Sequence, residues 1–104
     1  MILMFVDVSR EFTTPPDDVR VHLGDVAMLP CLIEGAPVPT IRWYKDSHVL
    51  ETQHVNYHLH ADGVLEIASV QQGDFGTFKC RAENSAESKT SVEATISMET
   101  NQGK

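Results

Sequence analysis

The sequence predicts an all-β domain, a sandwich of two antiparallel sheets, from three observations. Short segments that alternate apolar and polar residues recur between turn-forming residues along most of the chain. These segments have the two-residue period of strands rather than the period of amphipathic helices. Cys31 and Cys80 also bracket Trp43, with Trp43 twelve residues after the first cysteine. Seven or eight short strands fit in about 90 residues, as a sandwich requires.

Length and charge limit the classes of protein. The chain has 104 residues, enough for one compact domain. Fifteen acidic residues against eight Lys and Arg give a net charge of -7, which argues against a general nucleic-acid binder. No phosphate-binding glycine loop, nucleophile elbow or helical His pair is present, so we expect no enzyme and no cofactor.

We place the domain at residues 11–98. Residues 1–10 are interpreted as a leading linker or the end of a preceding domain, and residues 99–104 as a trailing linker. The apolar run 1–6 lacks a basic leading region and a small-residue cleavage site, so it is not a signal peptide. No segment reaches membrane-spanning length. We therefore expect an excised piece of a longer protein.

The first predicted strand with a clear pattern covers residues 26–33 and is followed by a loop rich in proline and glycine. Alternation places one set of its side chains in the core and the other on the outer surface. The outward set is apolar and consists of Val26, Met28, Pro30 and Leu32. Val64 of a neighbouring strand joins it on the same surface. Such a row indicates an interface, or a surface covered by the first strand or an adjoining domain.

Turn signals separate the later strands. Residues 40–45 alternate, and Asp46-Ser47 turns the chain into a short segment over 48–50. Asp62-Gly63 predicts a type I′ hairpin, in which both central residues have positive φ, between strands over 55–59 and 65–67. After residues 78–82, a turn leads to a last strand with one apolar face: Val92, Ala94, Ile96 and Met98.

Cys31 and Cys80 both fall at inward positions. We expect a disulfide that stabilises the domain by about 4 kcal/mol in the chain-entropy model. The alternative is a pair of free buried thiols, as in cytosolic domains of this architecture.

Three segments, 35–45 (GAPVPTIRWYK), 63–67 (GVLEI) and 74–80 (DFGTFKC), resemble the intermediate set (I-set) of the immunoglobulin superfamily over residues 11–98. The resemblance implies Greek-key topology, with Trp43, Leu65 and Phe78 packed around the disulfide. It also implies a first strand interrupted at Pro15-Pro16, leaving 19–22 to pair with the last strand.

Two residues depart from the family pattern. Phe78 replaces a tyrosine whose hydroxyl normally bonds back to the preceding loop. Asn56 stands where an arginine often pairs with the aspartate matched by Asp74. We therefore expect a weaker edge of the sandwich near these residues, with the same fold.

Strand parity places five side chains on one outer face: Arg42, Tyr44, Lys79, Arg81 and Lys89. A positive stripe beside an aromatic ring suits an acidic protein surface or a sulfated glycan. The alternative is an ordinary solvated face. His58 and His60 share another strand face, with His54 upstream, but a third ligand is missing, so we predict solvated histidines and no metal site.

The segment 63–67 and the Leu29-Pro30-Cys31 sequence are also similar to those of the neogenin and protogenin group of cell-surface receptors. That resemblance implies a non-catalytic recognition module of a single-pass receptor or adhesion protein, outside the cell, contacting a protein ligand or adjacent immunoglobulin or fibronectin domains. One alternative is a cytosolic structural domain of the titin or palladin kind, with which the absence of any Asn-x-Ser/Thr sequence is compatible. The other is an ectodomain module of a receptor kinase.

Overall fold

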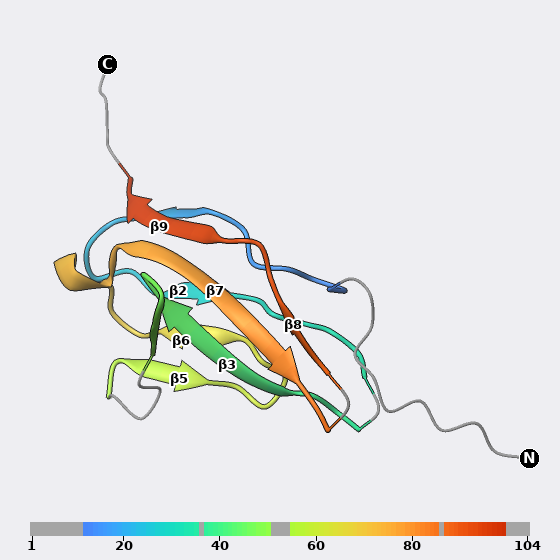
Figure 1. Cartoon of the computed structure of the whole chain (residues 1–104). Coiled ribbons are helices and arrows are strands. Elements are labelled where there is room, and N and C mark those ends of the chain that lie inside the picture. Colours follow the sequence, from blue (N-terminus) through green and yellow to red (C-terminus); the bar gives the residue numbers. More distant parts are fainter. Residues whose placement is uncertain (1–11, 36, 51–54, 86, 100–104) are drawn as a thin grey trace, which may run out of the picture.

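The computed structural model describes residues 12–35, 37–50, 55–85 and 87–99. They form two sheets facing each other, with one 3₁₀ turn, and the predicted linkers fall almost entirely outside the described residues (Figure 1). In chain order the elements are β1 (Val19–Val21), β2 (Ala27–Leu29), β3 (Thr40–Lys45), β4 (His48–Val49), β5 (Tyr57–Leu59), β6 (Leu65–Ile67), η1 (Gln72–Asp74), β7 (Gly76–Glu83), β8 (Ser88–Thr90) and β9 (Ala94–Met98).

The larger sheet has the order β1-β9-β7-β3-β4, and the smaller sheet has the order β2-β6-β5. β8 also belongs to the larger sheet and pairs with residues 81–83 of β7, whereas β9 pairs with residues 76–78. All pairs are antiparallel except β1 with β9. The long strands β3 and β7 lie side by side at the centre of the larger sheet (Figure 1). The predicted fold class, an immunoglobulin-like sandwich, is confirmed.

The first strand changes sheets at two prolines. Thr14 exchanges two backbone hydrogen bonds with Leu32, of 3.1 and 2.9 Å, and therefore lies beside the smaller sheet. Pro15 and Pro16 have no N–H to continue that ladder. After them β1 pairs in parallel with β9 of the larger sheet. This confirms the interruption of the first strand that the family resemblance implied.

The core lies between the sheets around the disulfide of Cys31 and Cys80, whose Cα atoms are 6.5 Å apart. Trp43 pairs with Cys80 across β3 and β7, and its indole Nε1 donates a 2.9 Å hydrogen bond to the carbonyl of Gly63. The other large, fully buried side chains come from both sheets and the loop before η1: Leu29, Leu65, Ile67, Val70, Phe78 and Ile96.

The type I′ turn lies between β3 and β4 and not at Asp62-Gly63. Asp46 and Ser47 have φ of 50° and 72°, so the two-residue hairpin has positive φ at both central positions. At the second hairpin only Gly63 has positive φ, at 96°. Its N–H bonds to the carbonyl of His60, three residues earlier, which is the geometry of a longer hairpin ending in a glycine. The prediction of a hairpin is confirmed and its type is corrected.

Two predicted strands are shorter than expected. The run 26–33 is a strand only over Ala27–Leu29, with a single further bridge at Leu32. In the last strand Ala94 and Ile96 are buried, but Val92 and Met98 are 66% and 41% exposed. Val92 precedes β9, and Met98 is the last residue of β9, where it pairs with Val21 of the edge strand β1.

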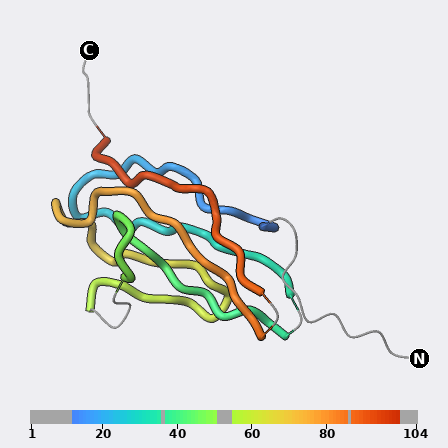
Figure 2. Tube along the Cα trace, viewed as in Figure 1, coloured from blue at the N-terminus to red at the C-terminus, as the bar shows by residue number. Residues whose placement is uncertain are grey.

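The described chain enters and leaves at opposite ends of the sandwich (Figure 2). The end where it enters also carries the turns before β3 and between β7 and β8, and the strand β9 leads out at the other end (Figures 1 and 2).

Candidate functional site

The outer face of the larger sheet brings four of the five predicted binding residues together. Arg42 lies opposite Arg81, and Tyr44 lies opposite Lys79, in the register of β3 and β7. Paired residues of antiparallel strands point to the same face. Their neighbours Trp43 and Cys80 are buried, so these four side chains point outward. Arg42 is exposed and the other three are half-buried.

Lys89 does not join them. It pairs with Ala82, which is buried, and therefore follows the inward parity. The cause is one extra residue between β8 and β9: Phe78 and Arg81 are three positions apart, whereas their partners Ala94 and Thr90 are four apart. An inserted residue of this kind reverses the parity of everything beyond it.

Ser91 holds this irregular segment in place. Its backbone N–H donates to the carbonyl of Cys80 over 2.8 Å, and its Oγ accepts the N–H of Cys80 over 3.0 Å. Its hydroxyl also donates to the carbonyl of Val92. Ser91 is buried, so its side chain replaces a backbone acceptor that the bulge removes from the ladder.

Arg20 joins the face instead. It pairs with Ser97 while its neighbours Val19 and Val21 pair with Ile96 and Met98, so it follows the outward parity and is exposed. We call the set Arg20, Arg42, Lys79 and Arg81, together with Tyr44, the basic face. The alternation of residues 19–21 could have revealed Arg20, had the parity of that strand been followed.

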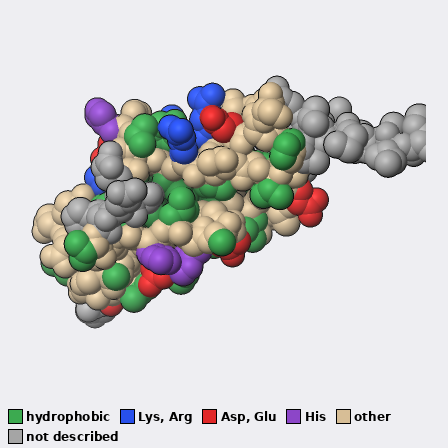
Figure 3. All heavy atoms as spheres, turned by 90° about the horizontal axis from the view of Figure 1, so that it is seen from below, with side chains coloured by type: hydrophobic (Ala, Val, Ile, Leu, Met, Phe, Trp, Pro, Cys, Tyr) green, Lys and Arg blue, Asp and Glu red, His purple; other side chains and the backbone are tan. Residues whose placement is uncertain are grey.

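Glu83 moderates the charge at one end of the basic face. The Nε of Arg81 lies 3.3 Å from Oε1 of Glu83, an ion-pair contact in which Nε does not form a well-directed hydrogen bond. The guanidinium NH2 group donates to Oγ of Ser88 over 2.9 Å. Arg42 and Lys79 have no ion-pair partner among the described residues. In Figure 3 Lys and Arg side chains gather along the upper border of the view, with acidic side chains beside them.

A buried carboxylate organises the edge of the sandwich where the family ion pair was in doubt. Asp74 accepts hydrogen bonds from the N–H of Gln71 at 2.8 Å, the amide of Asn56 at 3.1 Å and the hydroxyl of Tyr57 at 2.5 Å. Asn56 also exchanges two bonds with the backbone of Ser69. Uncharged donors thus replace the arginine, and one of them is the hydroxyl of Tyr57. Burial, and then the hydrogen bond to Asp74, raise the pKa of Tyr57 well above its usual value.

The β3–β4 turn has its own carboxylate clamp. Asp46 accepts the N–H of Thr77 over 3.0 Å and lies 3.0 Å from Nζ of Lys45. The hydrogen bond from Thr77, and then the one from Lys45, lower the pKa of Asp46. Gly76 lies next to the carboxylate of Asp46. A Cβ at position 76 would lie only 2.9 Å from that carboxylate.

The opposite sheet exposes part of the predicted apolar row. Val26 and Met28 are 55% and 49% exposed, and Pro30 and Leu32 are half-buried. Thr14 forms a backbone bridge to Leu32 at one end of the row.

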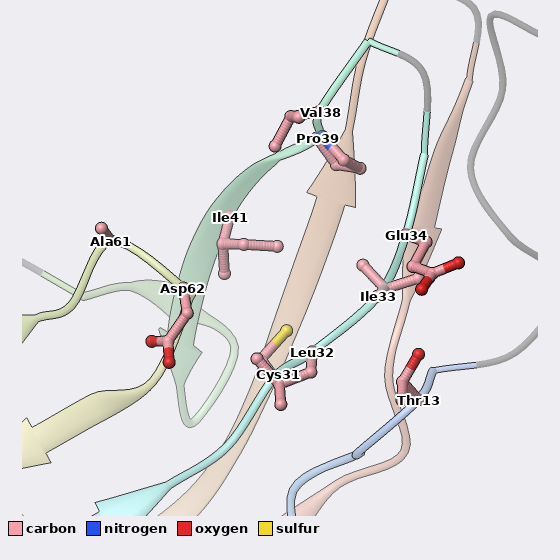
Figure 4. Close-up of a pocket in the computed structure, with 10 residues that line it drawn as sticks. All are labelled: Thr13, Cys31, Leu32, Ile33, Glu34, Val38, Pro39, Ile41, Ala61 and Asp62. Carbon is pink, nitrogen blue, oxygen red and sulfur yellow. The ribbon is translucent and has the colours of Figure 1, made fainter.

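A mainly aliphatic hollow of about 340 Å³ lies at the end where the described chain enters. It is lined by residues 31–34 and 61–62, together with Thr13, Val38, Pro39 and Ile41 (Figure 4). Glu34 and Asp62 are its only carboxylates, and none of its lining residues is a histidine or a free thiol. The described lining of the hollow therefore offers mainly apolar contact.

His58 and His60 lie in contact on the smaller sheet, with ring centroids 4.5 Å apart. His54 lies outside the described residues. Within the part of the chain that the structure describes, no three His, Cys, Asp or Glu side chains are grouped to hold a metal ion. The same residues include no helix with the length and apolar character of a bilayer span.

The fold, the Cys31–Cys80 disulfide and the buried Trp43 define an immunoglobulin-type sandwich. The model of the immunoglobulin I-set domain matches residues 10–98, and the chain belongs to that family. Domains of this family are generally non-catalytic modules of receptors and adhesion proteins.

The relatives are much longer than this chain. The chain is 38% identical over 78 residues to neogenin of Mus musculus, which covers 74% of this chain and 5% of neogenin. It is 33% identical over 87 residues to the netrin receptor DCC of Homo sapiens, which covers 82% of this chain and 6% of the receptor. The chain thus spans a small fraction of the length of these relatives.

Two solved structures show the same fold. The tandem immunoglobulin repeats of Dlar superpose with a TM-score of 0.81 at 27% identity, covering 86% of this chain and 47% of the other. A chain of the complex of titin M10 with obscurin-like 1 superposes with a TM-score of 0.78 at 29% identity, covering 86% of this chain and 92% of the other.

Proposed function

We propose that this domain is a non-catalytic recognition module in the extracellular part of a single-pass cell-surface receptor or adhesion protein, and that it binds an acidic partner through the basic face. The observation that carries the proposal is the register that sets Arg42 against Arg81 and Tyr44 against Lys79 on one outer face. Four of the six described Lys and Arg residues lie there, in a chain whose net charge is -7.

The chemistry of the face fits a charged protein surface. Arginine and tyrosine are enriched at protein interfaces, and guanidinium groups form paired hydrogen bonds to carboxylates. A sulfated glycan carries the same kind of acceptor, so it is the second ligand class for this face. The similarity to neogenin and to the netrin receptor DCC supports the placement on a receptor.

Charge reversal tests the face. Replacing Arg42, Lys79 and Arg81 with glutamate should weaken retention on immobilised heparin and on immobilised poly-glutamate by about tenfold or more at low salt. If the triple variant loses retention on poly-glutamate, the result supports an acidic protein partner. If it loses retention on heparin alone, the result supports a sulfated glycan. The single variant Arg42→Glu is measured beside the triple variant. Lys89→Glu is its matched control, because it makes the same charge change away from the basic face.

The triple variant, Arg42→Glu and Lys89→Glu should all keep the far-ultraviolet circular dichroism spectrum of the unsubstituted domain. Equal retention of the triple variant and the unsubstituted domain across a salt series would contradict the proposal, as would an equal effect of Lys89→Glu and Arg42→Glu.

A cytosolic structural domain is the second candidate, favoured by the superposition on the titin M10 complex. In that case the two cysteines would be thiols in the cell, because the cytosol keeps cysteines reduced. The receptor-kinase module is a further variant of the extracellular proposal. It places any catalysis outside this domain.

A further inference from the structure

The outer surface of the smaller sheet carries two imidazoles already arranged side by side. His58 lies in β5 and His60 just after it, so both side chains leave the same face of the strand. Their ring centroids are 4.5 Å apart and their planes are inclined by 70°. β5 is an edge strand of its sheet, and His58 is exposed. A group of histidines is visible on the lower border of Figure 3.

The sequence pattern predicted no metal site because it showed no third ligand. Glu66 is not that ligand, but its carboxylate contacts His60, which the sequence pattern did not show and which changes this expectation. It lies directly opposite His58 in the register of β5 and β6, and its Oε1 is 2.7 Å from Nε2 of His60. When Nε2 carries the proton and donates it to this carboxylate, the lone pair of His60 lies on Nδ1. Nδ1 of His60 and both ring nitrogens of His58 have no hydrogen-bond partner among the described residues. Two nitrogen lone pairs are therefore available at adjacent rings.

We propose that His58 and His60 chelate one divalent late transition-metal ion, with zinc as the reference case, and that Glu66 is a positioning residue. Imidazole nitrogen is a preferred ligand of zinc, copper and nickel, whereas calcium and magnesium prefer oxygen. With metal–nitrogen bonds of about 2.0–2.1 Å at a tetrahedral ion, two ligating rings have centroids about 5 Å apart. The observed centroid separation of 4.5 Å is close to this value.

The role of Glu66 follows from its contact with His60. Ligating histidines usually bond through their second nitrogen to a carboxylate or carbonyl, which fixes the tautomer and raises the basicity of the ring. The described residues supply no third ligand, so water completes the coordination. The site lies on the sheet opposite the basic face, and its occupation is independent of the proposed binding function.

Calorimetric titration of the whole chain with zinc chloride and nickel chloride at pH 7.5 tests the site. We expect one ion per chain, with affinity at least about tenfold lower in His58→Ala and in His60→Gln, which keeps a donor toward Glu66. Glu66→Gln should lower the affinity by about tenfold without abolishing binding. His48→Ala, which removes an exposed imidazole from the other sheet, is the matched control and should bind as the unsubstituted chain does.

Paramagnetic nickel provides a readout that loss of folding cannot imitate. In the amide spectrum of the unsubstituted chain, signals of residues in β5 and β6 should broaden first on addition of nickel chloride. Magnesium chloride should produce no change. Equal affinities of His58→Ala and the unsubstituted chain, or broadening centred on His22 or His48, would overturn the assignment.

Discussion

Asp74 shows how one buried carboxylate can be satisfied without a salt bridge. Its partners are a backbone N–H, the amide of Asn56 and the hydroxyl of Tyr57. The sequence predicted the lost arginine at position 56 and the lost hydroxyl at Phe78. It did not predict Tyr57 as the replacement, because that contact depends on the fold that brings β5 against η1. The expectation of a weak edge therefore missed a compensating set of hydrogen bonds.

We predict that Asp74→Asn lowers the free energy of unfolding by about 1–3 kcal/mol. An asparagine presents its NH₂ group to donors that now have no acceptor, and buried donors left unpaired are costly. Urea denaturation followed by tryptophan fluorescence measures the change. Asp17→Asn on the exposed loop should change the value by less than about 0.5 kcal/mol. Equal stability of both variants would show that the Asp74 contacts do not stabilise the domain.

Tyr57 also gives the domain a distinct response to alkali. Its pKa is raised in the folded state, so the folded protein holds this proton at pH values where the unfolded chain releases it. The stabilisation is fully present below the ordinary tyrosine pKa of about 10 and declines as pH rises above it. Urea midpoints measured between pH 8 and pH 11 should fall more steeply above pH 10 for the unsubstituted domain than for Tyr57→Phe. Parallel curves would contradict this assignment.

At the level of elements, turns and strand interruptions limited what the sequence could predict. Alternation around Cys80 and Trp43 correctly oriented β3 and β7, because both are continuous strands with a fixed period. The same rule failed for Lys89, since the bulge at Ser91 shifts the parity between β8 and β9. No local residue pattern marks that extra position before the pairing is known. The outward residues of the basic face were thus predictable on the regular strands β1, β3 and β7, whereas the position of Lys89 on β8 was not.

Gly63 provides a test of the hairpin between β5 and β6. Its φ is 96°, and a Cβ there would lie 2.6 Å from the carbonyl oxygen of Cys31. We predict that Gly63→Ala destabilises the domain by about 2–4 kcal/mol, because strain at positive φ adds to a clash with backbone. Gly73→Ala is the matched control, since nothing lies within 4 Å of its added Cβ. Chemical denaturation should separate the two variants, and similar values would contradict the described turn.

At the scale of the whole molecule, the described residues begin at one end of the sandwich and finish at the other (Figure 2). This arrangement suits domains joined in series, as in the tandem repeats of Dlar. The outer faces of the two sheets then differ in their side chains. The larger sheet carries the basic face, and the smaller sheet carries apolar and histidine side chains. The sequence predicted the sandwich because Cys31, Trp43 and Cys80 fix its core, but a partner is recognised by a surface, whose composition the fold constrains only weakly.

The state of Cys31 and Cys80 in the cell tests most directly the central claim that this is an extracellular recognition domain. Protein purified from its natural compartment should be unfolded without reductant and treated with a maleimide reagent, and the labelled cysteines counted by mass spectrometry. The account predicts no labelling at Cys31 or Cys80 before reduction and labelling of both after it. Labelling of both cysteines before reduction would contradict the extracellular placement and favour the cytosolic structural domain.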